Sequence, residues 1–215
     1  HMLVCWSVGG GVGTSVVVAG LAIAAARADQ PALVVDLGGD QPTIFGSPEP
    51  QGPGLAQWLD AADDVPAAAL RNLEVDLVPG VALLPRGAGP LPATRVPALH
   101  RALVDDDRFV VVDVGFTADR GAGEVLVEAA HRPVLVVRAC PIALRRLEHL
   151  PVRPSGVVVV RERRRSVSWQ DLADAAGAPV VAELEIDPAV AAAMDAGLDR
   201  RPLPRSFLRV LDGLR

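Results

Sequence analysis

Residues 3–36 read LVCWSVGGGVGTSVVVAGLAIAAARADQPALVVD, and the fold of the chain follows from this stretch. It begins with a short apolar run, Leu3 to Val8, which breaks at the glycine-rich turn 9–13. Residues 14–28 are rich in Ala and Val, as expected of a buried helix, and a second apolar run occupies 32–36. This order of strand, glycine turn, helix and strand predicts a βαβ unit, whose parallel strands need a right-handed helical crossover.

The alternation of strands and helices continues to the end of the chain. Further strands are expected at 75–78, 81–84, 109–114, 134–139, 157–160 and 180–184. Helices are expected at 55–62, 66–73, 93–104, 124–130, 142–150, 169–176, 188–196 and 207–214, with a loop over 37–54 and a kink at Pro97. The pattern predicts an α/β fold with a doubly wound, mostly parallel sheet and helices on both faces.

The composition is that of a soluble globular protein and predicts one domain over residues 1–215, with His1 and Met2 as a cloning remnant. No apolar run reaches the roughly 18 residues that span a bilayer, and no signal peptide follows Met2. Cys5 and Cys140 lie in apolar surroundings typical of core thiols. These features predict a cytoplasmic protein.

The charge of the chain restricts its partners and its chemistry. The net charge of −5 and the isoelectric point of about 5.4 argue against non-specific binding to nucleic acid, which needs a basic surface. All 21 basic residues are arginine, so that no step of any reaction here uses a lysine ammonium group.

The glycine turn between the first strand and the first helix predicts an anion site. Ligands of open α/β sheets bind at the carboxyl ends of the strands, where backbone N–H groups and a helix N-terminus surround a phosphate. In a phosphate loop, a lysine also contacts the β- and γ-phosphates, and a Ser or Thr hydroxyl binds Mg²⁺. Ser15 has the right position for that hydroxyl, whereas Thr14 stands where the lysine is expected.

The turn Gly9-Gly10-Gly11-Val12-Gly13-Thr14-Ser15 resembles the deviant Walker A loop of the MinD/ParA family, a P-loop NTPase-like family whose motif is K-G-G-V-G-K-[ST]. The resemblance covers nearly the whole chain. The stretches that carry it are 33–37 (second strand), 45–59 (the LG…GL..LL stretch), 110–113 (Walker B strand) and 186–197 (the IP.D..V..A…G segment). The CpaE/TadZ branch, associated with pilus assembly, is the most similar in character.

The resemblance implies an ATPase that dimerises around ATP and positions division, chromosome, flagellar or pilus machinery. By the family motif, the residual phosphate-loop and cofactor-binding positions of this chain are Gly9, Gly10, Gly11, Val12, Gly13, Thr14, Ser15, Asp36, Asp40 and Asp113. Ser15 and Asp113 would hold the metal if a magnesium nucleotide binds.

The departures from the family pattern fall on the chemistry. The signature lysine, which reaches the partner's phosphates across the dimer, matches Gly9, and the loop lysine matches Thr14. The second aspartate of the switch motif matches Gly38, and Asp40 would replace it only in a remodelled loop. The base-reading asparagine is replaced by Arg161. Loss of both lysines is expected to weaken nucleotide affinity by about two to four decades, since hydrogen bonds to charged groups are worth about 1.5–3 kcal/mol each.

The sequence therefore favours a non-catalytic MinD/ParA-like protein that acts as a dimerising scaffold or localisation factor for pilus or division machinery. No catalytic residue and no cofactor are expected, although weak binding of Mg-ATP or ADP remains open. The expected partners are a second copy of the chain and a protein of localisation or secretion machinery.

Two alternative functions remain open at this point. One is a slow ATPase that contacts phosphate through arginine and backbone groups, with Asp40 or Asp113 handling water and metal. The other is a DNA-associated regulator that uses the arginine run 161–165, which the acidic isoelectric point disfavours. The C-terminal segment 207–214 is expected to make at most a peripheral membrane contact.

Overall fold

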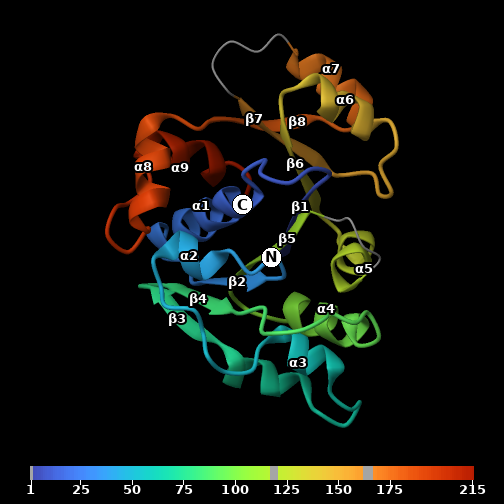
Figure 1. The fold of residues 1–215 in the computed structure, drawn as a ribbon, viewed down its shortest axis with the longest axis vertical. Helices are drawn as coiled ribbons and strands as arrows, with labels where there is room; N and C mark the ends of the chain where they lie inside the picture. Colours follow the sequence, from blue (N-terminus) through green and yellow to red (C-terminus); the bar gives the residue numbers. More distant parts are fainter. Residues whose placement is uncertain (1, 117–120, 162–166) are drawn as a thin grey trace.

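The computed structural model describes residues 2–116, 121–161 and 167–215. These residues form an eight-stranded sheet in the order β3-β4-β2-β5-β1-β6-β7-β8, in which only β3 is antiparallel to its neighbour (Figure 1). The strands are β1 Met2–Ser7, β2 Ala32–Asp36, β3 Val75–Val78, β4 Val81–Leu84, β5 Phe109–Phe116, β6 Pro133–Arg138, β7 Gly156–Arg161 and β8 Val180–Glu185. The predicted α/β fold with a mostly parallel sheet is confirmed.

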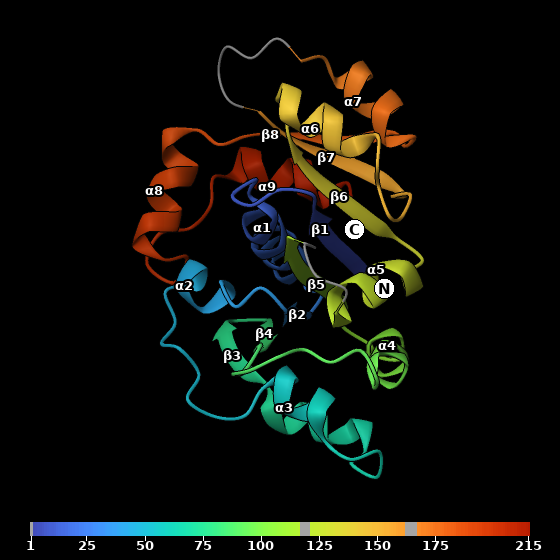
Figure 2. The same ribbon diagram turned by 45° about the vertical axis from the view of Figure 1, so that its right-hand side comes forward.

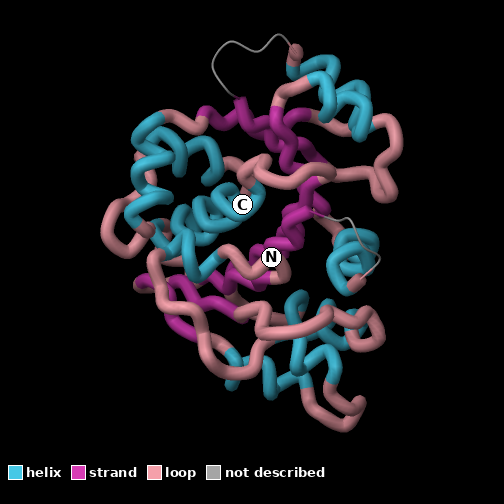
Figure 3. Tube along the Cα trace, viewed as in Figure 1, coloured by secondary structure: helices cyan, strands magenta, loops and turns pink. Residues whose placement is uncertain are grey.

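Helices cover both faces of the sheet, as Figures 1 and 2 show, and the strands run as one band through the middle of the molecule in Figure 3. The helices are α1 Thr14–Arg27, α2 Gln41–Phe45, α3 Leu55–Asp60, the 3₁₀ helix η1 Ala67–Leu73, α4 Val96–Val104, α5 Ala122–Ala129, α6 Pro141–Leu147, α7 Trp169–Ala176, α8 Pro188–Ala196 and α9 Arg205–Asp212. Helices α1, α2, α8 and α9 pack on one face, and η1 and α3 to α7 pack on the other.

The central strands are buried on both faces, which explains their unbroken apolar sequences. In β1, Leu3 and Cys5 join the core under α1, whereas Val4 and Trp6 join the core on the opposite face. All four side chains are at most 1% exposed. The sheet therefore holds its carboxyl edge in a fixed position, and that edge carries the glycine turn.

Three details differ from the sequence-based expectation. The stretch expected as loop, 37–54, contains the short helix α2, which begins at Gln41 with Pro42 in its first turn. The helix expected over 93–104 begins at Val96, so Pro97 lies in the first turn and causes no kink, because the first turn needs no amide hydrogen there. The segment expected as α-helix at 66–73 is the 3₁₀ helix η1.

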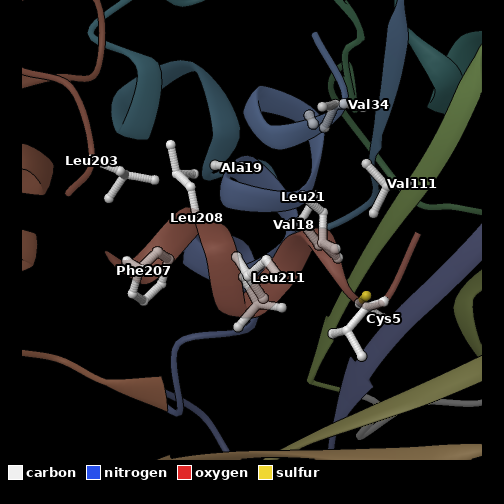
Figure 4. Packing of buried hydrophobic residues seen from close by; sticks show 14 of the residues in the cluster. Cys5, Val18, Ala19, Leu21, Val34, Val111, Leu203, Phe207, Leu208 and Leu211 are labelled. Atoms are coloured by element: carbon white, nitrogen blue, oxygen red, sulfur yellow. The ribbon is translucent and has the colours of Figure 1, made fainter. Parts of the chain in front are cut away.

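The C-terminal helix α9 packs on α1 rather than presenting its apolar side to the outside (Figure 4). Phe207, Leu208, Leu211 and Leu214 are each at most 6% exposed, and they share a core with α1. These four of the apolar residues considered for a peripheral membrane contact are therefore used inside the fold, whereas Val210 is 39% exposed. No helix in the described ranges combines the length and apolar character needed to cross a membrane.

The close approach of α9 to α1 depends on Gly20. A methyl group at this position would overlap Leu211 Cδ1 and lie 3.1 Å from Phe207 Cε1. We expect Gly20→Ala to lower the free energy of unfolding by up to about 2 kcal/mol, because overpacking costs about 1–3 kcal/mol and the better helix propensity of Ala returns about 1 kcal/mol. Urea denaturation measures the change.

The matched control is the same substitution in a Leu211→Ala background, where the overlap is gone. There, Gly20→Ala should be neutral or stabilising. A gain of stability from Gly20→Ala in the unmodified chain would contradict the tight packing described here.

Candidate functional site

The glycine turn joins β1 to α1 at the carboxyl edge of the sheet. Gly11 and Gly13 have φ angles of +67° and +96°, a region that side chains with a Cβ atom rarely adopt. The Ser7 hydroxyl donates to the Gly9 carbonyl at 3.0 Å and lies 3.2 Å from the Gly115 carbonyl oxygen at the end of β5. The turn is thus held by its own sequence and by its neighbouring strand, and Gly13 begins helix α1 without a side-chain cap.

Two aspartates end neighbouring strands beside this turn. Asp36 of β2 and Asp113 of β5 are register partners in the sheet, and both are 0% exposed. Asp36 accepts hydrogen bonds from the backbone N–H groups of Gly39 at 2.7 Å and Gln41 at 3.1 Å. Asp113 accepts from the backbone N–H of Gly115 at 3.1 Å and from the Ser15 hydroxyl. The pair therefore lies inside a network of donors from three segments of the chain: residues 39–41, the end of β5 and the start of α1.

The Gln41 side chain closes this network. Its amide nitrogen donates to Asp113 Oδ2 at 2.6 Å and to the Ser15 carbonyl oxygen at 3.0 Å. Both partners are acceptors, which fixes the amide with its nitrogen toward Asp113. The residue is 0% exposed, and its Oε1 has no hydrogen-bond partner within the described ranges. A neutral donor thus binds the Oδ2 atom of Asp113.

Burial and mutual repulsion disturb the acidity of both aspartates. Burial, followed by the nearby charge of Asp113, raises the pKa of Asp36 to about 7, although the backbone N–H groups of Gly39 and Gln41 oppose the rise. Burial also raises the pKa of Asp113 against the hydrogen bonds from Gln41 and Ser15. The site therefore favours a proton on the pair over two negative charges at neutral pH.

Helix α2, which carries Gln41, is fixed from its other end. The backbone N–H groups of Leu198 and Asp199 donate to the Ile44 and Phe45 carbonyls, both at 3.0 Å. A methyl group at Gly46, the C-cap of α2, would overlap the Asp199 carboxylate, so the two segments meet without a gap. The connection after β2 is therefore a packed element of the fold.

Two arginines approach the outer side of the glycine turn. Arg138, at the end of β6, donates to the Gly11 carbonyl at 2.6 Å, and Arg146 of α6 donates to the Val8 carbonyl at 2.9 Å. Arg146 also fills the space beside Gly9, where a methyl group would overlap its Nη1 atom. Both side chains line a cavity of about 290 Å³ between the turn and α6.

The structure brings together most of the residues that the sequence singled out. Residues 9–15, Asp36 and Asp113 converge at one edge of the sheet, with Ser15 bound to Asp113 and with Thr14 buried, its hydroxyl unpartnered among the described residues. Asp40 is exposed at the start of α2.

The arginine run 161–165 is only partly described. Arg161 ends β7 and forms an ion pair with Glu183 of β8. Residues 163–165 lie outside the described residues.

Sequence reasoning missed Gln41, Arg138 and Arg146. The sequence did contain a signal for the helix that carries Gln41, because Asp40-Gln41-Pro42 has the polar residue and early proline typical of a helix N-terminus. The two arginines had none, since only the pairing of β6 with β1 and the packing of α6 bring them to the turn. In the described ranges, no group of three or more His, Cys, Asp or Glu side chains has the arrangement of a metal site.

The raised pKa of Asp36 makes stability depend on pH. In the unfolded chain Asp36 loses its proton near pH 4, whereas in the fold it keeps the proton to about pH 7. The unfolded state thus binds fewer protons in this window, and stability falls as pH rises from about 4 to about 7, by at most about 1.4 kcal/mol per pH unit. Urea denaturation between pH 4.5 and 8 measures the slope.

The Asp36→Asn variant should reduce this slope, because it has no proton to lose. The exposed Asp63→Asn variant serves as the control and should keep it. An unchanged slope in Asp36→Asn would contradict the assignment.

Comparison with solved structures places this geometry in a known fold. The chain is similar to a ParA family ATPase from Chlorobium tepidum, at 19% identity and a TM-score of 0.79, over 100% of this chain and 97% of that one. It is also similar to the cell division protein MinD of Aquifex aeolicus, at 18% identity and a TM-score of 0.75, over 99% and 94%. The septum site-determining protein MinD of Pyrococcus horikoshii, complexed with Mg-ADP, matches at 16% identity and a TM-score of 0.76, over 100% and 94%.

The sequence itself gives a more specific assignment. No curated protein sequence matches the chain. The family model described as cellulose biosynthesis protein BcsQ matches residues 1–112, which is more than half of the 215 residues. Together with the MinD/ParA fold, this match shows that the chain belongs to the BcsQ family, within the MinD/ParA group.

Proposed function

We propose that the chain is a non-catalytic member of the MinD/ParA group that acts as a dimerising scaffold or localisation factor. The observation that carries the proposal is the hydrogen bond from Gln41 Nε2 to Asp113 Oδ2 at 2.6 Å. In the family pattern the aspartate at this position faces Mg²⁺. Here a neutral amide donates to one oxygen of this aspartate, and both residues are 0% exposed.

The residues around the turn do not fit a magnesium nucleotide. Thr14 and Gly9 supply no positive charge, and no lysine exists elsewhere in the chain or in a second copy of it. Phosphoryl transfer depends on positioning and on charge neutralisation, so loss of both lysines and of the metal position removes the main contributions to rate. We derive no hydrolytic step for this site.

The proposed function also does not use the segment after β2 as a nucleotide-dependent switch. In a nucleotide-dependent switch, this segment changes its contacts with the state of the nucleotide. Here α2 is held between Asp36 and the 198–199 backbone. A module with a fixed connection suits constant binding of a partner better than a cycle of binding and release.

The partner we propose is a protein of localisation, secretion, pilus or division machinery, with a second copy of the chain forming a homodimer. Two relatives support this class: the family model is described as a cellulose biosynthesis protein, and MinD of Aquifex aeolicus has been solved as a MinC:MinD cell division protein complex.

The alternatives have less support. Arg138 and Arg146 donate to the Gly11 and Val8 carbonyls of the turn, and neither stands at the sequence position of a family lysine. For a DNA-associated regulator, the described part of the arginine run offers Arg161 alone, which is already paired with Glu183.

A hydrolysis assay tests the loss of catalysis. The purified protein should release phosphate from Mg-ATP no faster than its Asp113→Asn variant, because the proposed site contributes nothing to the rate. Gly10→Ala serves as a second reference within the turn. A rate that both substitutions abolish would establish the slow ATPase instead.

Restoring the missing groups tests the role of Gln41. Thr14→Lys alone should regain part of the lost affinity for Mg-ATP. Thr14→Lys with Gln41→Ala should bind at least about tenfold tighter than Thr14→Lys alone, since a charged contact is worth about 1.5–3 kcal/mol once the metal position opens. Calorimetry with and without EDTA measures the ATP affinity of both variants. EDTA should remove the extra affinity that Gln41→Ala adds, because that affinity depends on the metal ion.

The control for charge is Thr14→Met with Gln41→Ala. Methionine has a long unbranched side chain like that of lysine but lacks the ammonium group. Equal affinity of the Thr14→Lys variants with and without Gln41→Ala would show that Gln41 does not close the metal position.

A further inference from the structure

Helices α1 and α9 lie side by side and enclose an open hollow of about 750 Å³, here called the α1–α9 hollow (Figures 1 and 2). The last turn of α1 forms one wall and one face of α9 forms the other, with lining residues Ala24, Arg27, Ala28, Arg205, Leu208, Arg209 and Asp212. The glycine turn precedes the opposite end of α1, which is 14 residues long. Roughly 20 Å of helix therefore separates the hollow from the glycine turn.

The charge of the hollow comes from three exposed arginines, Arg27, Arg205 and Arg209. Within the described ranges, none of the three forms an ion pair or donates a side-chain hydrogen bond. Asp212 also lines the hollow, but the Nε atom of Arg215 donates to its Oδ1 atom at 2.8 Å. The hollow thus presents positive charge without a counter-ion, on a chain whose net charge is −5.

This arrangement costs the isolated chain stability. Arg205 is the first residue of α9, where the helix dipole disfavours a positive charge. Arg209 follows four residues later on the same face of the helix, and like charges at that spacing repel each other. Anionic groups placed in the hollow would remove both costs.

The hollow has an apolar floor between its arginines. Ala24 and Leu208 are 6% and 5% exposed, and Ala28 continues the same side of α1. A single inorganic anion would leave this floor uncovered. A ligand that has both carboxylates and an apolar side chain would use the arginines and the floor together.

We propose that the α1–α9 hollow is the docking site for an acidic segment of a partner protein. Carboxylates of that segment would pair with Arg27, Arg205 and Arg209, and an apolar side chain of it would lie on Ala24, Ala28 and Leu208. The proposal rests on the proposed function, because it gives the scaffold a place to hold its partner.

The charge of the whole chain favours a protein segment over nucleic acid. The chain has 26 acidic and 21 basic residues, so a DNA duplex that extends beyond the hollow would meet an excess of acidic side chains. The phosphate backbone of DNA would also leave the apolar floor unused. A short acidic segment has neither disadvantage.

A second copy of the chain is a weaker candidate for the occupant. Its exposed acidic residues Asp60, Asp63 and Asp64, which follow α3, could supply carboxylates to the hollow. Such a contact joins two different surfaces, and contacts of that kind extend into open chains of molecules unless the rotation closes a ring. This geometry does not agree with the homodimer of the proposed function.

The experiment measures fluorescence anisotropy of a short labelled peptide in which glutamate and leucine alternate, titrated with the full chain in EDTA at low ionic strength. The peptide should bind saturably, and added salt should weaken the binding because the charged groups lie near the surface. A peptide of alternating glutamine and leucine tests the carboxylates, and a peptide of alternating glutamate and serine tests the apolar contact. Both should bind more weakly than the first peptide.

The variant that tests the site carries Arg205→Gln with Arg209→Gln. It should bind the glutamate–leucine peptide at least about tenfold more weakly, since two exposed charge pairs together account for about that factor. Its urea midpoint should be equal to or above that of the unmodified chain, because a repulsive pair is gone. Arg101→Gln with Arg145→Gln, on the exposed sides of α4 and α6, makes the same change in net charge and should leave peptide binding unchanged.

Several results would overturn the proposal. Absence of saturable peptide binding would do so, as would equal weakening by the two pairs of substitutions. Tighter binding of a DNA duplex, lost with Arg205→Gln and Arg209→Gln, would assign the hollow to nucleic acid. Self-association of the chain that the same pair of substitutions abolishes would assign it to a second copy. Since the assay contains no nucleotide or free magnesium, its failure is distinct from a failure of the proposed loss of ATP hydrolysis.

Discussion

The hydrogen bond between Gln41 and Asp113 is the contact on which the whole edge of the sheet depends. In-register pairing of β2 and β5 forces two buried aspartates side by side, and a buried pair of carboxylates needs donors or a cation to persist. Gln41 and Ser15 supply donors to Asp113, and the backbone of the 39–41 segment supplies them to Asp36. The fold thus satisfies with its own side chains a place that its relatives' pattern leaves for a metal ion.

Under the proposed function, the missing lysines and the Gln41 amide act in the same direction on the site. A loop without positive charge has little use for a metal position, and a closed metal position leaves the loop without a triphosphate to hold. Both changes preserve the stability of the fold, because the turn keeps its glycines at Gly11 and Gly13 and helix α1 keeps its packing on the sheet. What remains is an α/β fold with a packed core on each face of its sheet.

The fold could be predicted almost completely from the sequence, whereas the site could be predicted only in part. Unbroken apolar runs such as 109–114 are typical of strands in a sheet that is buried on both faces. The glycine turn indicates which edge of that sheet carries the site. The short helix α2 was missed because its five residues depend on the contact with Leu198 and Asp199, which are distant in sequence. Arg146 was missed for a related reason, since only the packing of α6 beside β1 gives it Val8 as a partner.

The most direct measurement of the central claim is calorimetric titration of the purified protein with Mg-ATP and with Mg-ADP. The account predicts no binding heat at millimolar nucleotide for either, because the lysines are absent and Gln41 occupies Asp113. Binding in the micromolar range, lost when Asp113 is changed to Asn, would contradict the account. Backbone groups or arginines would then hold the phosphates, and the chain would work as a nucleotide-dependent switch.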